Sequence, residues 1–137
     1  MRRLLLILPA MVLLLSCQSK EKVIRYDGLY RTESLILTRD TITSFLRFYP
    51  DGKVISMNKL GSTKDIESWF NLDLEDVSKG TVDLKQDTLR FEGTSSMGTV
   101  QYEGGIDEDA GLTLNITQSN GDISVKKYHF VKVSDLK

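Results

Sequence analysis

Few residues of this chain have side chains that could carry out chemistry. Its 137 residues include one cysteine, Cys17, and one histidine, His129. A lone cysteine forms no intrachain disulfide and supplies too few thiolates for a multi-cysteine zinc site. A hydrolytic triad would have to use His129, yet no Gly-x-Ser-x-Gly segment accompanies it. We therefore expect no catalytic residues, no metal site and no cofactor, and we interpret the protein as non-enzymatic.

The charges exclude one further class of partner. Lys and Arg number 18 against 19 Asp and Glu, so the formal net charge is −1. Nucleic-acid binding requires an excess of positive charge on one surface. An acidic run, Asp107-Glu108-Asp109, lies between Ile106 and Leu112 and could in principle hold calcium, but its spacing does not complete an EF-hand. We interpret this run as a solvated turn and expect no nucleic-acid partner.

The N-terminal residues have the pattern of an export signal. Arg2 and Arg3 precede an apolar run from Leu4 to Leu15 that is interrupted only by Pro9. A positive start followed by such a run is typical of a secretory signal peptide. The run is too short for a transmembrane helix, which needs about 20 apolar residues.

The residues that end this run resemble the lipobox of bacterial lipoproteins. They read Leu14-Leu15-Ser16-Cys17. The resemblance implies cleavage between Ser16 and Cys17 and acylation of Cys17 by diacylglycerol and palmitate-type chains, which would anchor the protein to a membrane. The alternative is an ordinary secreted protein with a stray thiol. Gln18 after the cysteine favours the outer membrane, and either face remains open.

Three segments follow from this interpretation. We expect a signal peptide over 1–16, a lipidated flexible tether over 17–22 and a folded domain over 23–137. Loss of Arg2 and Arg3 leaves 16 basic against 19 acidic residues, a formal charge of −3.

The folded domain reads as a series of short strands. Apolar and polar residues alternate, as in Leu112, Leu114 and Ile116, and turn residues such as Pro50-Asp51-Gly52 and Asn120-Gly121 separate the runs. The expected strands cover 24–34, 42–49, 53–58, 79–85, 87–94, 97–106, 111–118 and 123–133. Eight antiparallel strands joined by short turns predict an all-β meander that closes into a small barrel. An open or sandwiched sheet is the alternative.

One segment departs from the strand pattern. Ser62 and Asp65 suggest a helix start, and Ile66, Trp69 and Phe70 follow at helical spacing. We expect a short helix over 63–70 that covers one mouth of the barrel with Trp69. A strand is the competing interpretation, because Phe70, Leu72 and Leu74 alternate with polar residues.

Several stretches resemble small lipocalin-like (calycin-like) bacterial lipoproteins of unknown function. They are Gly28-Leu29-Tyr30, the stretch over 46–52, Ser68-Trp69-Phe70, the stretch over 98–104 and Tyr128-His129-Phe130. The resemblance implies a barrel that binds a small apolar ligand or an envelope partner. Ser95 to Tyr102 resembles, more distantly, a loop of lipoprotein inhibitors of lysozyme.

The aromatic residues give the candidate binding residues. If the barrel holds a ligand, we expect Trp69, Phe91, Tyr102 and Tyr128 to line the cavity. The competing hypothesis is a solid, packed barrel that docks a protein through its outer surface. Asp40-Thr41-Ile42 and Asp87-Thr88-Leu89 match a three-residue glycosylation pattern of exported proteins, which makes Thr41 and Thr88 candidate modification sites.

Overall fold

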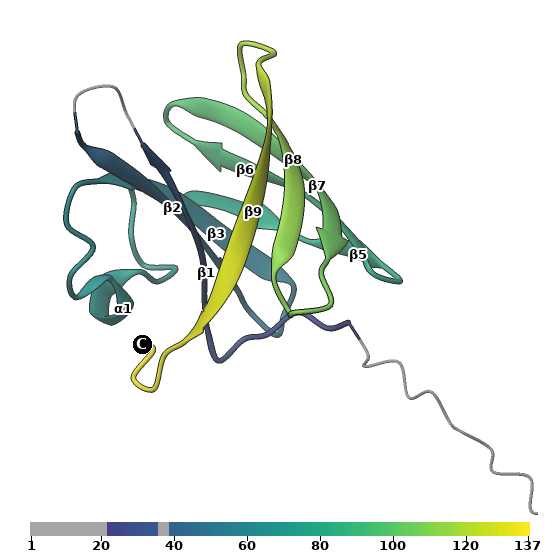
Figure 1. Cartoon of the computed structure of the whole chain (residues 1–137), viewed down its shortest axis with the longest axis horizontal. Coiled ribbons are helices and arrows are strands. Elements are labelled where there is room, and N and C mark those ends of the chain that lie inside the picture. Colours follow the sequence, from purple (N-terminus) through teal and green to yellow (C-terminus); the bar gives the residue numbers. More distant parts are fainter. Residues whose placement is uncertain (1–21, 36–38) are drawn as a thin grey trace, which may run out of the picture.

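The protein is a nine-stranded antiparallel sheet that closes on itself (Figure 1). The structure is a computed structural model and describes residues 22–35 and 39–137. The elements are β1 (Gly28–Leu35), β2 (Thr41–Phe48), β3 (Lys53–Leu60), α1 (Ile66–Trp69), β4 (Ser78–Thr81), β5 (Asp83–Lys85), β6 (Thr88–Ser95), β7 (Gly98–Ile106), β8 (Leu112–Thr117) and β9 (Ile123–Lys132). Among the described residues, no helix has the length and apolar character needed to cross a membrane.

The sheet closes where β4 meets β6. The strand order is β4-β3-β2-β1-β9-β8-β7-β6-β5, and Lys79 of β4 also pairs with Thr94 of β6. A Cβ on Gly80 would lie 2.0 Å from the Glu92 carbonyl oxygen, so only glycine allows this close approach. β5 follows β4 after a break at Val82 and continues along β6. The result is a closed eight-stranded barrel with one extra strand, which confirms the predicted barrel.

Alternation along the strands fills the barrel interior. Tyr30 pairs with Leu46, Phe91 with Tyr102, and Leu112 with Tyr128, so the partners in each pair share a face. The inward-facing apolar residues form one cluster, which comprises Ile24, Tyr30, Leu46, Phe48, Val54, Leu89, Phe91, Tyr102, Ile106, Leu112, Leu114, Ile116 and Tyr128. Removing this apolar surface from water is the main favourable contribution to folding.

A second apolar cluster lies outside the barrel. Outward-facing Leu29, Phe45 and Ile55 are each at most 2% exposed because the segment over 61–77 covers them. Ile66 and Phe70 of that segment pack on them, and partly buried residues from the chain's last turn join the same cluster. β2 is therefore buried on both faces.

The predicted helix differs in length and position from the observed one. α1 has four residues, Ile66–Trp69, rather than the expected 63–70. Ser62 does not cap it: the Ser62 hydroxyl accepts a hydrogen bond from the Lys64 N–H, and Asp65 at the helix start makes no side-chain cap bond. The alternative, a strand through Phe70, Leu72 and Leu74, is not formed either. α1 lies beside the outer wall, because outward-facing Phe45 and Ile55 offer its apolar face a dry surface.

Candidate functional site

One end of the barrel is closed by the chain that enters it. Ile24 packs into the interior cluster just before β1, and the Arg25 backbone N–H donates a 2.9 Å hydrogen bond to the Tyr30 hydroxyl. The Arg25 guanidinium lies 4.0 Å from the centre of the Phe130 ring. These contacts seal the end where the N-terminal segment arrives.

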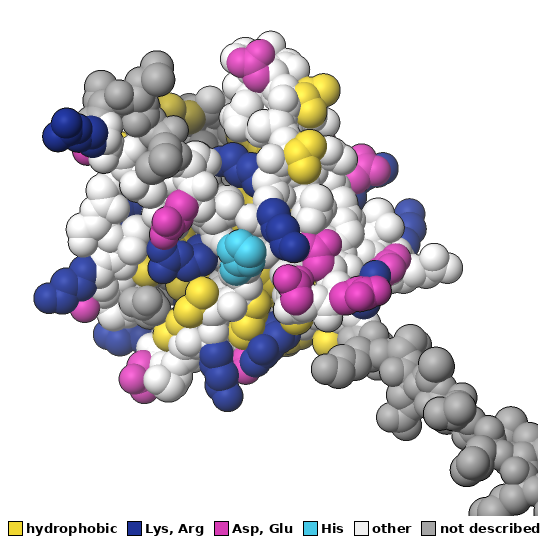
Figure 2. Space-filling model, in the orientation of Figure 1, with side chains coloured by type: hydrophobic (Ala, Val, Ile, Leu, Met, Phe, Trp, Pro, Cys, Tyr) yellow, Lys and Arg dark blue, Asp and Glu magenta, His cyan; other side chains and the backbone are white. Residues whose placement is uncertain are grey.

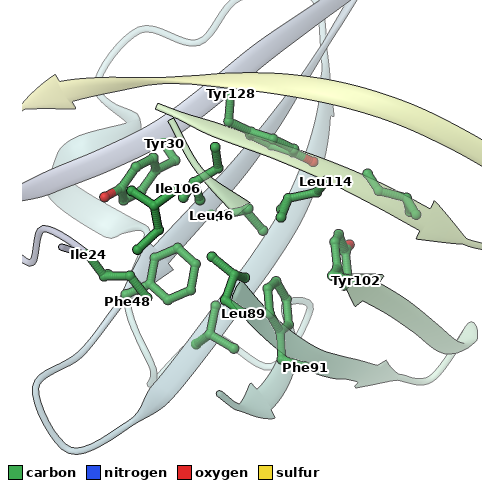
Figure 3. Close-up of a cluster of buried hydrophobic side chains, with 13 residues drawn as sticks. Ile24, Tyr30, Leu46, Phe48, Leu89, Phe91, Tyr102, Ile106, Leu114 and Tyr128 are labelled. Atoms are coloured by element: carbon green, nitrogen blue, oxygen red, sulfur yellow. The ribbon is translucent and has the colours of Figure 1, made fainter. Parts of the chain in front are cut away.

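Aromatic rings fill the interior next to this closed end (Figure 3). The Tyr30 and Phe48 rings meet edge to face at 5.4 Å, and Phe48 meets Phe91 in the same way at 5.9 Å. Phe91 in turn stacks on Tyr102 at 4.4 Å. Edge-to-face and offset-stacked contacts are the favoured arrangements of aromatic rings. Side chains therefore occupy this half of the interior.

The opposite end holds a pocket. It has a volume of about 330 Å³ and is lined by residues that include Ser56, Asn58, Ser78, Met97, Val100 and Tyr102. We call it the mouth pocket. It opens where β3 ends, β4 begins, and the β6–β7 hairpin turns. Its wall combines hydroxyl and amide groups with the apolar side chains of Met97 and Val100.

Polar side chains lie at and beside the floor of this pocket. The Tyr102 hydroxyl donates to Ser56 Oγ at 3.3 Å, and Lys126 Nζ donates to Ser44 Oγ at 3.0 Å. Tyr128 completes the group; its hydroxyl and that of Tyr102 lie on the side of the cluster away from Ile24 and Phe48 in Figure 3. We call Ser44, Ser56, Tyr102, Lys126 and Tyr128 the polar layer. Of these, Ser56 and Tyr102 line the mouth pocket, and Ser44 is the strand partner of Asn58, which also lines it.

Burial changes the proton affinities of this layer. Desolvation raises the pKa of Tyr102, and it raises the pKa of Tyr128 further, with the neighbouring Tyr102 phenol adding to the rise. Desolvation lowers the pKa of Lys126. The phenols therefore stay neutral donors over the physiological range, while the amine carries a charge that its surroundings solvate poorly.

The structure brings together three of the four predicted cavity residues. Phe91, Tyr102 and Tyr128 share the interior, and of these Tyr102 lines the mouth pocket. Trp69 does not join them, because it lies with the outer cluster, where Lys59 Nζ is 4.9 Å from the centre of its ring. Trp69 therefore covers the outer wall and not a mouth.

The sequence interpretation missed Ser44, Ser56 and Lys126. Lys126 is in phase with Tyr128 on β9, and period-2 alternation places both on one face. That signal was present in the sequence, but Lys126 follows exposed Val125 and precedes exposed Lys127, so nothing local marks it as inward-facing. Ser44 lies in a strand that is buried throughout its second half, where alternation gives no signal.

The candidate lipidation, cleavage and glycosylation residues lie away from the mouth pocket or outside the described residues. Ser16 and Cys17 lie outside the described residues, as does nearly all of the expected tether over 17–22. Thr41 is half-buried at the start of β2, and Thr88 is exposed at the start of β6.

The carboxylates of the acidic run before β8 accept hydrogen bonds from groups within or next to the same turn. Asp107 Oδ2 accepts a 2.9 Å hydrogen bond from the Thr113 hydroxyl, and Asp109 accepts one of 3.1 Å from the Gly111 N–H. Within the part of the chain that the structure describes, no group of three or more metal-ligating side chains occurs.

Comparison with known proteins gives no relative. No protein-family model, no curated protein and no solved structure matches this chain.

Proposed function

We propose that this protein is a membrane-anchored, non-enzymatic lipoprotein whose lipocalin-like barrel binds a small molecule at its mouth. The mouth pocket carries the proposal: about 330 Å³ of space opens at one end of a barrel that is otherwise filled with side chains. Binding pockets of small molecules begin at about this volume and combine apolar walls with a few placed polar groups.

The position of the anchor agrees with this function. The N-terminal segment reaches the barrel at its closed end, where Lys22 Nζ lies 3.7 Å from an Asp87 carboxylate oxygen and Ile24 enters the core. The mouth pocket lies at the other end of the strands. An acylated Cys17 would hold the closed end toward the membrane and leave the mouth accessible from the aqueous side.

The interior limits the size of the ligand. Because aromatic side chains fill the half next to Ile24, a long apolar molecule has no room to extend through the barrel. A ligand in the mouth pocket would place its apolar part against Met97 and Val100 and its polar part against the polar layer. The proposal is therefore a small ligand with both kinds of surface.

A second candidate function is docking to an envelope protein through the outer face of β9. Ile123 and Val125 are 72% and 66% exposed, and Figure 2 shows hydrophobic side chains next to the β8–β9 hairpin. Two exposed apolar residues two positions apart on one strand face are typical of a contact surface. Docking would use the outer face of β9 and would not require an empty pocket.

Native mass spectrometry of the full chain purified from its host membranes tests the mouth pocket. We expect a co-purifying small molecule with the natural sequence and its loss in Asn58→Trp, because the indole would occupy the mouth pocket from an exposed position. Asn115→Trp, an exposed asparagine on the outer face of β8, is the matched control and should retain the molecule. The intact mass also reports acylation of Cys17.

Two results would contradict the proposal. One is natural protein that carries no small molecule although its mass shows acylation. The other is a molecule that Asn58→Trp and Asn115→Trp retain equally. Loss of a protein partner in Val125→Lys with an unchanged small-molecule content would favour docking in addition to binding.

A further inference from the structure

Lys126 is a charged residue that faces into the barrel. Its β8 partner is Leu114, and the pairs on either side, Leu112 with Tyr128 and Ile116 with Ser124, confirm the shared inward face. The ammonium group reaches across the sheet to the buried hydroxyl of Ser44, which is 3% exposed. The flanking Lys127 faces outward, where its Nζ lies 3.7 Å from an Asp109 carboxylate oxygen.

No carboxylate balances this charge from inside the described barrel. The acidic residues in the described strands alternate with the inward residues and are exposed; they are Glu33, Asp83, Glu92 and Glu103. None of the ion pairs among the described residues includes Lys126. Asp76, on the segment before β4, is the one carboxylate that lines the mouth pocket, and it is exposed at the rim.

An unbalanced ammonium inside a barrel costs stability unless something compensates it. Moving a cation away from water is unfavourable, and the lowered pKa of Lys126 reflects that cost. An ammonium group has three N–H donors, and the Ser44 hydroxyl accepts one hydrogen bond. The remaining donors lie beside the mouth pocket, because Ser44 is the strand partner of Asn58, which lines that pocket.

The groups around Lys126 are suited to an acceptor. The hydroxyls of Ser44 and Ser56 accept hydrogen bonds from Lys126 and Tyr102, so each still has its own proton to donate. Burial keeps the Tyr128 phenol protonated, which adds a third donor. Hydroxyl donors close to one positive charge stabilise an anionic oxygen. The single charge matches a monoanion, whereas a phosphate dianion would remain half neutralised.

We propose that the mouth pocket binds a small monocarboxylic acid with its carboxylate inward, held by Lys126 and the hydroxyls of the polar layer. This inference rests on the proposed function, because it names the ligand class of the same pocket. The apolar part of the acid would face Met97 and Val100 toward the opening.

An NMR titration of the full chain in neutral detergent micelles tests the inference. The probes are 3-phenylpropionate and its amide, 3-phenylpropanamide, which differ in charge and little in shape. We expect the acid to shift the amide signals of Ser44, Ser56 and Tyr102, and to bind at least about tenfold more tightly than the amide. In Lys126→Met the two probes should bind equally, and Lys126→Arg should keep the preference for the acid.

Lys127→Met is the matched control, because it removes the same charge from the outward face of the same strand and should leave the preference unchanged. Lys126→Met should fold, since it exchanges a poorly solvated charge for an apolar side chain of similar length. Equal binding of both probes to the natural chain, or an equal preference in Lys126→Met, would overturn the carboxylate site and leave the mouth pocket as a binding site. No shift at the mouth with either probe, together with no small molecule on the protein purified from its host, would overturn the proposed function itself.

Discussion

At the scale of single residues, Arg47 ties the outer segments to the barrel. It is 6% exposed on the outward face of β2, and its guanidinium donates 2.7 Å hydrogen bonds to the main-chain oxygens of Phe70 and Lys137. The same group lies 4.8 Å from the centre of the Tyr49 ring. One side chain thus holds two segments that no strand pairing fixes, and its planar fork allows both bonds at once.

We therefore expect Arg47→Met to lower the free energy of unfolding by about 3 kcal/mol, because the buried carbonyl oxygen of Phe70 and the partly buried main-chain oxygen of Lys137 lose charged donors. Urea denaturation measures the loss, and hydrogen exchange over 61–77 should rise. Arg90→Met is the control: its ion pair with Glu103 is exposed, and its removal should cost no more than about 0.5 kcal/mol. A similar loss in both variants would show that Arg47 has no special role.

At the scale of elements, close contact between strands depends on glycine at particular positions. Gly104 of β7 faces Leu114 of β8, and a Cβ there would lie 2.0 Å from the Thr113 carbonyl oxygen. Gly105 is the next residue, yet its nearest neighbour would be the Asp87 carbonyl oxygen at 3.8 Å. Two adjacent glycines in one strand thus have different requirements, because successive Cβ positions point to opposite faces and only the one at Gly104 meets the β8 backbone.

Gly104→Ala should destabilise the barrel by about 3 kcal/mol, since the backbone of β7 or β8 must move. Gly105→Ala should be neutral or stabilising by up to about 1 kcal/mol, because alanine restricts the unfolded chain and fits the folded one. Thermal and urea unfolding of both variants make the comparison. Equal destabilisation by Gly105→Ala and Gly104→Ala would contradict this expectation.

For some strands, local sequence signals were sufficient to predict both the strand and the face that it turns inward. The alternation in β6, β7 and β8 predicted both the strands and their inward faces, because each has one dry and one wet side. Asn120-Gly121 correctly marked the β8–β9 hairpin. Such a pair is typical of a type I′ turn, in which both residues have a positive φ, but of the two only Gly121 has one here. The hydrogen bonds from Gln118 N–H to Asp122 and from Gly121 N–H to Gln118 close a longer loop instead.

At the scale of the whole molecule, the barrel holds several phenols in a dry interior. Burial raises the pKa of Tyr30, Tyr102 and Tyr128 above their ordinary value of 10.0. Above that pH the unfolded chain loses protons that the folded chain keeps, so stability falls as pH rises. Desolvation raises the pKa of Tyr49, outside the barrel, in the same way. The pKa of Lys126 is lowered from 10.5, so below that pH this one amine changes stability in the opposite direction to the four phenols.

The barrel should therefore unfold in alkali. We expect the free energy of unfolding to be nearly constant from about pH 7 to 9 and then to fall by about 1.4 kcal/mol per pH unit for each phenol kept neutral. Urea titrations across this range measure the slope. Tyr128→Phe should reduce the slope by one phenol; the same slope in Tyr128→Phe as in the natural chain would contradict this account.

The sequence by itself determined the all-β class, the positions of the barrel strands and the inward aromatic residues Phe91, Tyr102 and Tyr128. Those features depend on local alternation and on turn residues, which are visible within a few positions of the chain. Only the tertiary structure decided that Trp69 packs outside the wall, that β2 is buried on both faces, and that Lys126 meets Ser44. Lys126 and Ser44 are 82 residues apart, and their contact exists because β1 pairs with both β2 and β9. Closure of the barrel created the polar layer, and no local pattern in the chain encodes it.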